Sequence, residues 1–170
     1  GAADRMCAYL KERWEKPGSR YHVMKEMFDC LHKLEVLSAD WPKKVRHYEK
    51  VLFGGGRKQY EALHQYRMPD KIAEQLLSYF IYVYFAGAVY DGMPYSKVKL
   101  AVISTMLIED MVCAKAAEKG QLSFEAIADA AHSYAREVEH SDLNLQRLSI
   151  MFRHQKCFHI GRLCGALLEW

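Results

Sequence analysis

Apolar residues recur at helical spacing along most of the chain. Between residues 20 and 37 they fall every three or four positions, as on one face of an α-helix; they are Val23, Met27, Cys30, Leu31 and Leu34. No stretch alternates apolar and polar residues as a strand would, and no repeat period is visible. Capping residues and breaks at glycine or proline predict helices over residues 4–15, 20–37, 40–53, 58–66, 70–90, 96–119 and 123–140, and a last one through Phe152. The sequence therefore predicts an all-α, single-domain bundle of about eight helices.

The segment from Glu74 to Tyr90 is apolar or aromatic on every face of a helix. A helix without a polar stripe has to be surrounded by other apolar groups. The segment is too short to cross a bilayer core of roughly 30 Å, and Ser78 and four tyrosines interrupt it, so we expect protein around it. We predict a central apolar helix over residues 70–90, the least exposed in the domain, antiparallel to the nearly as apolar helix at 96–119.

The chain has 170 residues, of which 51% are hydrophobic and 26% are charged, an ordinary balance for one folded domain. Helical spacing is clear as far as Phe152 and weak after it. We therefore predict a helical domain over residues 4–155 and a weakly helical C-terminal tail over residues 156–170. Because the chain starts with Gly1 rather than Met, we expect the natural protein to be longer.

The net charge of +3 arises from 24 basic and 21 acidic residues that are scattered along the chain. This charge is too small and too dispersed to mark a nucleic-acid-binding surface. The densest basic run, at residues 43–47, is typical of a solvated helix face. We therefore expect neither nucleic acid nor a membrane among the partners of this protein.

The five cysteines form an odd set without a Cys-x-x-Cys pair; they are Cys7, Cys30, Cys113, Cys157 and Cys164. All stand among apolar residues in helix-like contexts, so we interpret them as reduced core thiols of a cytosolic protein. The N-terminus has no basic segment followed by an apolar run, which a secretory leader would have. The predicted location is the cytoplasm.

Two Glu-x-x-His pairs have the spacing of di-iron helical bundles, in which the carboxylate and the imidazole share a helix face; they are Glu61 with His64 and Glu137 with His140. Glu35 and Glu109 fall in the order that would complete a four-helix site. However, eight histidines among many glutamates produce such spacings by chance. A second group, near the C-terminus, has spacings that scatter its side chains around a helix, unlike a zinc site; it consists of His154, Cys157, His159 and Cys164. We predict no metal in this chain.

Arg136, Glu139 and His140 lie one turn apart on the helix predicted at 123–140. At this spacing an ion pair or a charge-assisted hydrogen bond is within reach, and a carboxylate beside an imidazole holds one tautomer. We take these three residues as the candidate catalytic group. The alternative is an ion pair that only stabilises the end of the helix.

The order of the segments resembles the C-terminal half of the flagellin lysine N-methylase (FliB-type) family. In that family a Glu-Asn-Tyr-Leu-Val-Tyr-Tyr-x-Phe-like segment precedes a helix pair and an Arg-x-x-Glu-His-like segment. The matching positions in this chain are Glu74, Leu77, Tyr79, Phe80 and Tyr82, followed by Arg136, Glu139 and His140. The likeness spans residues 30–152, and Gln75 stands where the family often has Asn.

The resemblance implies the transfer of methyl groups from S-adenosylmethionine to flagellin lysines. It also implies a cysteine-rich N-terminal half that is thought to hold an iron–sulfur cluster. This chain lacks such closely spaced cysteines, so we expect it to hold neither cofactor and to be inactive alone. The expected partners are flagellin and the cysteine-rich half of the same protein.

The sequence also allows two other functions for an all-α bundle. One is a ligand-binding and dimerisation module like the regulatory domain of a TetR-type repressor, although no DNA-reading helix-turn-helix is evident. The other is the di-iron bundle. A basic three-helix unit before Gly1 would favour the repressor, and a cysteine cluster there would favour the methylase.

Overall fold

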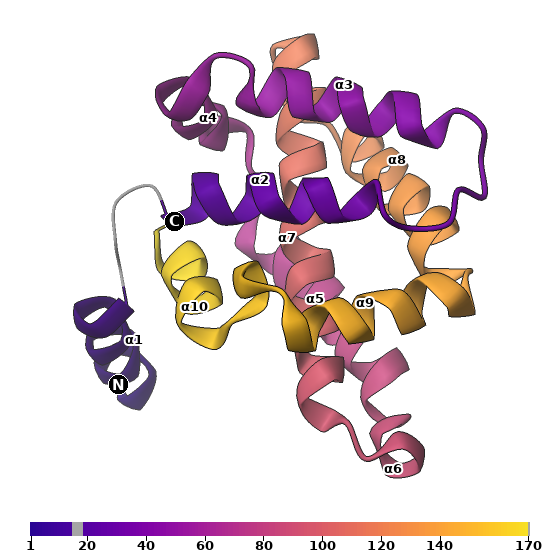
Figure 1. Ribbon diagram of the computed structural model, residues 1–170. Coiled ribbons are helices and arrows are strands. Elements are labelled where there is room, and N and C mark those ends of the chain that lie inside the picture. Colours follow the sequence, from indigo (N-terminus) through magenta and orange to yellow (C-terminus); the bar gives the residue numbers. More distant parts are fainter. Residues whose placement is uncertain (15–18, 170) are drawn as a thin grey trace.

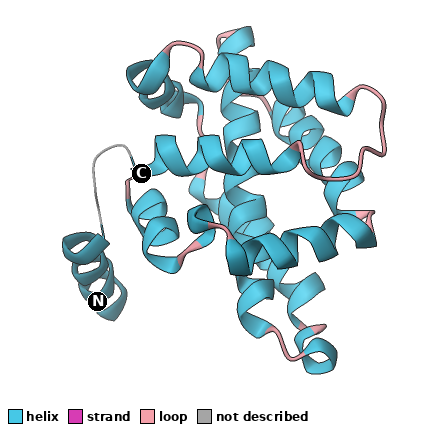
Figure 2. Cartoon of the chain, in the orientation of Figure 1, coloured by secondary structure: helices cyan, strands magenta, loops and turns pink. Residues whose placement is uncertain are grey.

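The computed structural model describes residues 1–14 and 19–169, and every regular element in them is helical (Figures 1 and 2). The α-helices are α1 (Ala2–Trp14), α2 (Ser19–Leu31), α3 (Trp41–Phe53), α4 (Gly56–Leu63), α5 (Asp70–Phe85), α6 (Ala88–Asp91), α7 (Pro94–Lys119), α8 (Phe124–Tyr134), α9 (Asp142–His154) and α10 (Ile160–Leu168). Shorter turns are the 3₁₀-helices η1 (His64–Tyr66) and η3 (Lys156–Phe158) and the π-helix η2 (Ala135–Glu139).

The predicted all-α fold is confirmed, and the predicted number of helices is close to the observed number. The described residues contain ten α-helices rather than about eight. The segment predicted as one helix at 70–90 is divided into α5 and α6, and α10 forms where only a weakly helical tail was expected. Helix α10 contacts α2 and α1 and buries Leu163 and Ala166. No described helix is long and apolar enough to span a membrane.

The prediction of a central helix at 70–90 was wrong, because α7 takes that place. Sixteen residues of α7 are buried, and this helix contacts α2, α3, α4, α5, α8 and α9. In contrast, Phe80 is the single buried residue of α5. Helix α5 packs on α7 with one face only, so Tyr82 on its other face is 85% exposed. In Figure 1, α7 runs through the middle of the molecule, α5 lies alongside it and α6 lies at the bottom of the view.

Helices α2 and α3 supply the apolar faces that their spacing predicts. Every apolar residue named for the segment at 20–37 is buried, and so are the predicted core positions of α3, namely Val45, Tyr48, Leu52 and Phe53. Helix α2 nevertheless ends at Leu31 instead of residue 37. Distant side chains bind the backbone N–H groups that would have extended the helix: Asn144 Oδ1 accepts from Glu35, and the Glu137 carboxylate accepts from Leu37 (3.0 Å) and Ser38 (3.2 Å).

Helix ends follow the local signals in most places. Ser123 accepts a hydrogen bond from Ala126 N (3.2 Å) and begins α8, and Ser141 accepts one from Asn144 N (3.1 Å) and begins α9. Gly120 ends α7 at a φ of +69°, a conformation that favours glycine. These caps determine where α8 and α9 begin, on either side of η2.

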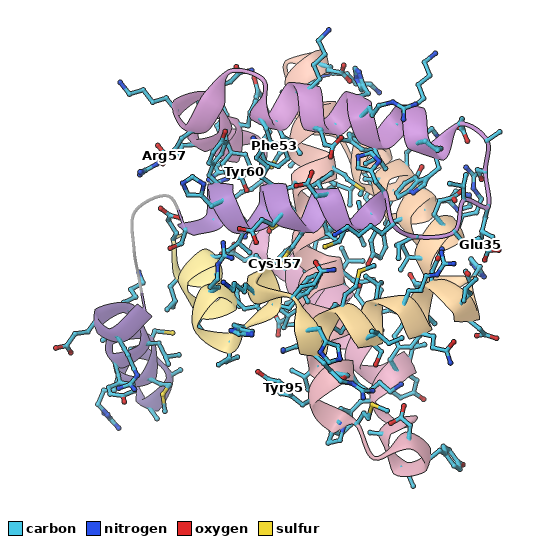
Figure 3. The ribbon with its side chains drawn as sticks, in the orientation of Figure 1. Glu35, Phe53, Arg57, Tyr60, Tyr95 and Cys157 are labelled. Carbon is cyan, nitrogen blue, oxygen red and sulfur yellow. The ribbon has the colours of Figure 1, made fainter. Side chains whose placement is uncertain are left out.

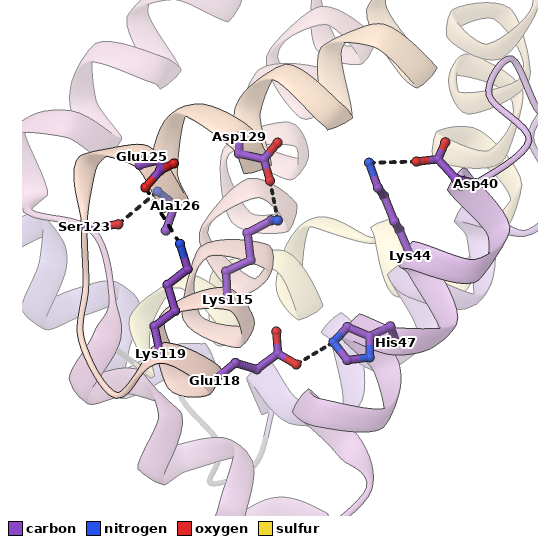
Figure 4. A network of polar contacts seen from close by, with 10 residues as sticks. All are labelled: Asp40, Lys44, His47, Lys115, Glu118, Lys119, Ser123, Glu125, Ala126 and Asp129. Carbon is purple, nitrogen blue, oxygen red and sulfur yellow. Dashed lines mark hydrogen bonds and ion pairs between the residues drawn. The ribbon is translucent and has the colours of Figure 1, made fainter.

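Surface ion pairs connect α3, α7 and α8 (Figure 4). The His47 imidazole lies 2.6 Å from a Glu118 carboxylate oxygen, and Lys115 on α7 pairs with Asp129 on α8. Asp40 precedes α3 as predicted, but its side chain pairs with Lys44 (3.0 Å) instead of capping the helix. Exposed pairs of this kind contribute little to stability, typically about 0–1 kcal/mol each.

Candidate functional site

The two segments that carry the family resemblance meet in space. The Glu139 carboxylate, at the end of η2, accepts hydrogen bonds from the Tyr79 and Tyr84 hydroxyls of α5, both over 3.0 Å. The hydrogen-bonded pairs are separated by 60 and 55 residues in the chain. We call these three residues the tyrosine–carboxylate site.

Phe80 places α5 so that the two tyrosines reach Glu139. Its ring is 1% exposed, lies 6.3 Å from the Tyr84 ring and meets the Tyr134 ring edge-on at 6.4 Å. Tyr134 is itself hydrogen-bonded to Ser104 of α7 over 2.8 Å. The site therefore rests on a buried aromatic contact between α5, α7 and α8.

The π-helix η2 directs the side chain of Glu139 toward α5. Sequence analysis predicted one continuous α-helix from 123 to 140, but the chain widens into a π-turn at Ala135–Glu139. The Asn144 amide fixes this turn by donating to the backbone carbonyls of Glu137 (2.7 Å) and Glu35 (2.9 Å). One extra residue in a turn rotates the side chains that follow, and such turns are frequent at functional sites. Neither the Asn144 contacts nor the loop that they join is visible in local spacing.

The two tyrosines stay neutral hydrogen-bond donors. Burial and the nearby Glu139 carboxylate both raise the pKa of Tyr84, and the same two causes raise the pKa of Tyr79. The site opens to solvent, because Tyr79 is 49% exposed and Glu139 is half-buried. An exposed carboxylate held by two phenols, beside aromatic ring faces, suits a cation such as an ammonium group.

Arg136 and His140 flank Glu139 in the sequence, but Arg136 has other neighbours in space. The Arg136 guanidinium lies 3.6 Å from Asp40 and 3.6 Å from Glu137, whereas Glu139 turns to the tyrosines. His140 is exposed where η2 ends. The structure thus places Arg136, Glu139 and His140 on one turn and directs Arg136 away from Glu139. Their joint catalytic role stays a prediction.

Three of the four glutamates of the predicted di-iron site lie in separate places. Glu61 pairs with Arg57 on the exposed face of α4, Glu109 lies beside Arg20, and Glu35 contacts Ser141. Within the residues that the structure describes, no group of three or more His, Cys, Asp or Glu side chains could hold a metal ion. Of the five cysteines taken as core thiols, Cys7 is exposed and Cys164 is half-buried; the described side chains of α1 are all exposed except the half-buried Leu10.

A buried polar network joins α2, α4 and α7, and sequence analysis missed it. The Asp110 carboxylate accepts hydrogen bonds from the Arg20 guanidinium (2.9 Å) and from the Tyr60 hydroxyl (2.8 Å), and Glu109 lies 3.7 Å from Arg20. The signal in the sequence was the adjacent acidic pair in the middle of an apolar helix, because buried carboxylates need a cation or hydrogen-bond donors. The network lies away from the tyrosine–carboxylate site and holds three helices together.

Glu109 should make stability depend on pH. Burial raises its pKa from 4.5 to about 7 in the folded protein. A carboxyl group with a raised folded pKa favours folding below its unfolded pKa, and this contribution is lost as the pH rises through 7. We expect the free energy of unfolding to fall by about 2 kcal/mol between pH 5 and pH 8. Urea titrations across this range should show the decline in the wild type and a flatter profile in Glu109→Gln; equal slopes would contradict the assignment.

Comparison with known proteins identifies the family of the chain. The family model described as the FliB lysine N-methylase C-terminal domain matches residues 3–166, nearly the whole chain. Neither the curated proteins nor the solved structures give a significant match. The repressor-like and di-iron alternatives are not favoured by this result. The segments that meet at the tyrosine–carboxylate site thus lie within one matched region, and the chain belongs to the family of FliB lysine N-methylase C-terminal domains.

Proposed function

We propose that this chain is the C-terminal helical domain of a lysine N-methylase that modifies flagellin, and that it acts with a cysteine-rich N-terminal half of the same protein. Membership of the family supports the reaction class. One observation carries the proposal for the site: Glu139, which belongs to one motif segment, is bound by Tyr79 and Tyr84 of α5, the helix that carries the other segment.

The tyrosine–carboxylate site suits the side chain of a substrate lysine. An ammonium group offers three N–H donors and a positive charge, and Glu139 offers a carboxylate that is still half-exposed. The exposed ring of Tyr79 adds an aromatic face for the cation. Before the lysine nitrogen can attack a methyl carbon it must lose a proton, and Glu139 and the exposed His140 are our candidates to accept it.

The cofactors implied by the family are proposed to bind outside this chain. S-Adenosylmethionine would supply the methyl group. An iron–sulfur cluster needs several converging thiolates. Cys30 and Cys157 are neighbours, but the other described thiols lie apart: Cys7 on α1, Cys113 in the middle of α7 and Cys164 on α10. These residues do not fit such a cluster.

A protein partner is also supported by the apolar surface beside the site. Helices α5 and α6 expose large apolar side chains without a covering element, and Tyr82, Val89 and Tyr90 are the most exposed of them. Contiguous exposed apolar groups mark interaction surfaces. We propose that the N-terminal half of the methylase covers this surface and so brings the methyl donor to Glu139.

Methylation of purified flagellin tests the proposed function. The full-length enzyme with S-adenosylmethionine should add methyl groups to flagellin lysines, detected by mass spectrometry of the digested protein. The chain of residues 1–170 alone should add none, because the donor site is proposed to lie outside it. Full activity of an enzyme from which this domain has been deleted, or no lysine methylation by the intact enzyme, would contradict the proposal.

A further inference from the structure

A second site lies on another part of the molecule. A cavity of about 1200 Å³ opens where the first turns of α2, α7 and α10 meet the last turns of α1 and α9. None of the residues that line it belongs to the tyrosine–carboxylate site. Figure 3 labels Tyr95, one of the aromatic residues of its wall. The volume exceeds the usual range of about 300–1,000 Å³ for small-molecule sites, so there is room for a ligand of nucleotide size.

The wall of this cavity is strongly basic. Its described residues include three arginines, one lysine and two histidines, from five different helices or their flanks: Arg13, His22, Lys99, Arg153, His159 and Arg162. Among the described residues of the wall, Glu26 is the single acidic one. The described residues of the wall therefore carry a formal charge of +3.

Lys99 is the most buried of these cations. Its residue is 6% exposed, and its ammonium donates to the Phe152 carbonyl (2.9 Å) and lies 4.4 Å from the centre of the Tyr95 ring. Burial lowers the pKa of this ammonium. A neutral carbonyl and an aromatic ring compensate a buried charge incompletely, so an anion in the cavity would stabilise Lys99.

The arginines in the wall of the cavity have the geometry to bind phosphate groups. Arg162 is held in place by Glu26, whose two oxygens lie 2.6 and 2.9 Å from its guanidinium nitrogens. Arg153 is exposed on the last turn of α9, where its guanidinium contacts Met93 Sδ. Guanidinium groups bind phosphoryl oxygens in pairs, and several cations around one space favour a ligand with several negative charges.

We propose that this cavity binds a small molecule that carries several phosphate charges, of the nucleoside triphosphate class, with its phosphates between Lys99 and Arg153. The substrate lysine and S-adenosylmethionine both carry positive groups, so a basic cavity disfavours them. The cavity thus adds an anion-binding function to the domain that the methyl-transfer proposal does not include.

Thermal denaturation and titration calorimetry of the chain test this assignment with ATP, inorganic tripolyphosphate and adenosine. ATP and tripolyphosphate in large excess should each raise the melting temperature by several degrees, and adenosine should leave it unchanged. Binding should weaken as salt is raised. In Arg153→Gln, the loss of a charge-assisted contact should raise the Kd for ATP about tenfold or more. Lys99→Met should raise the Kd for ATP by a similar factor. If Lys99→Met does not fold, Arg153→Gln alone provides the test.

Arg46→Gln is the matched control, because Arg46 is exposed on α3 and does not line the cavity. Its Kd for ATP should equal that of the wild type. Three results would overturn the proposal: no melting shift with either phosphate compound, ATP binding of wild-type strength in a folded Arg153→Gln, or a shift with S-adenosylmethionine that equals the ATP shift and is lost in the same variant.

Discussion

Asp110→Ala should lower the free energy of unfolding by about 3–5 kcal/mol, the usual cost of removing one partner from a buried ion pair. Asp110 and Arg20 are each 1% exposed, and the Asp110 carboxylate also accepts the Tyr60 hydroxyl hydrogen bond. The substitution would leave a guanidinium in the core without its nearest counter-charge and a buried phenol without its acceptor. Guanidinium chloride unfolding, followed by circular dichroism, measures the loss.

A surface ion pair provides the control for this result. Arg57 and Glu61 are one turn apart on α4, with 2.5 Å between Nε and a carboxylate oxygen, and each side chain is 45% exposed. Glu61→Ala should therefore change the free energy of unfolding by less than about 1 kcal/mol. If Asp110→Ala cost no more than Glu61→Ala, the network would not hold α2, α4 and α7 together.

Phe80→Ala should cost about 3–5 kcal/mol, as the truncation of other buried aromatic side chains does. Phe80 is the one buried side chain of α5, so its removal leaves a cavity against Tyr134 and loosens the helix that carries Tyr79 and Tyr84. Tyr82→Ala, on the exposed face of the same helix, should change stability by no more than about 0.5 kcal/mol. Urea midpoints of the two variants give the comparison, and equal midpoints would show that α5 is not anchored through Phe80.

The sequence predicted the fold class and the faces of several helices, because those features are local. Apolar spacing identified the buried sides of α2 and α3, and Ser123 and Gly120 marked helix ends through their own backbone and side-chain chemistry. The approximate number of helices followed from the same signals.

Features that depend on distant contacts could not be read from spacing. Helices α5 and α7 are both apolar, and only the packing of the other helices decides that α7 is covered on all sides while α5 keeps an open face. The backbone of Leu37 and Ser38, predicted to be at the end of a helix, is bound instead by Glu137, about a hundred residues later in the chain. The basic cavity combines residues between Arg13 and Arg162, although no part of the sequence is strongly basic.

The candidate catalytic group also depends on both local spacing and distant contacts. A spacing of three and four residues predicts that Arg136, Glu139 and His140 share one helix face, but the π-turn and the fold send Arg136 toward Asp40 and Glu139 toward Tyr79. The family resemblance identified both segments of the tyrosine–carboxylate site. It could not show that they touch.

Methyl transfer by a Glu139→Gln variant of the full-length enzyme tests most directly whether Glu139 binds and deprotonates the substrate lysine. Because Glu139 is half-exposed, the variant should keep the melting temperature of the wild type, and Glu125→Gln, an exposed carboxylate on α8, provides the matched control. The account predicts that kcat/KM for flagellin methylation falls about a hundredfold in Glu139→Gln and stays unchanged in Glu125→Gln. Wild-type kcat/KM in a folded Glu139→Gln enzyme would contradict it.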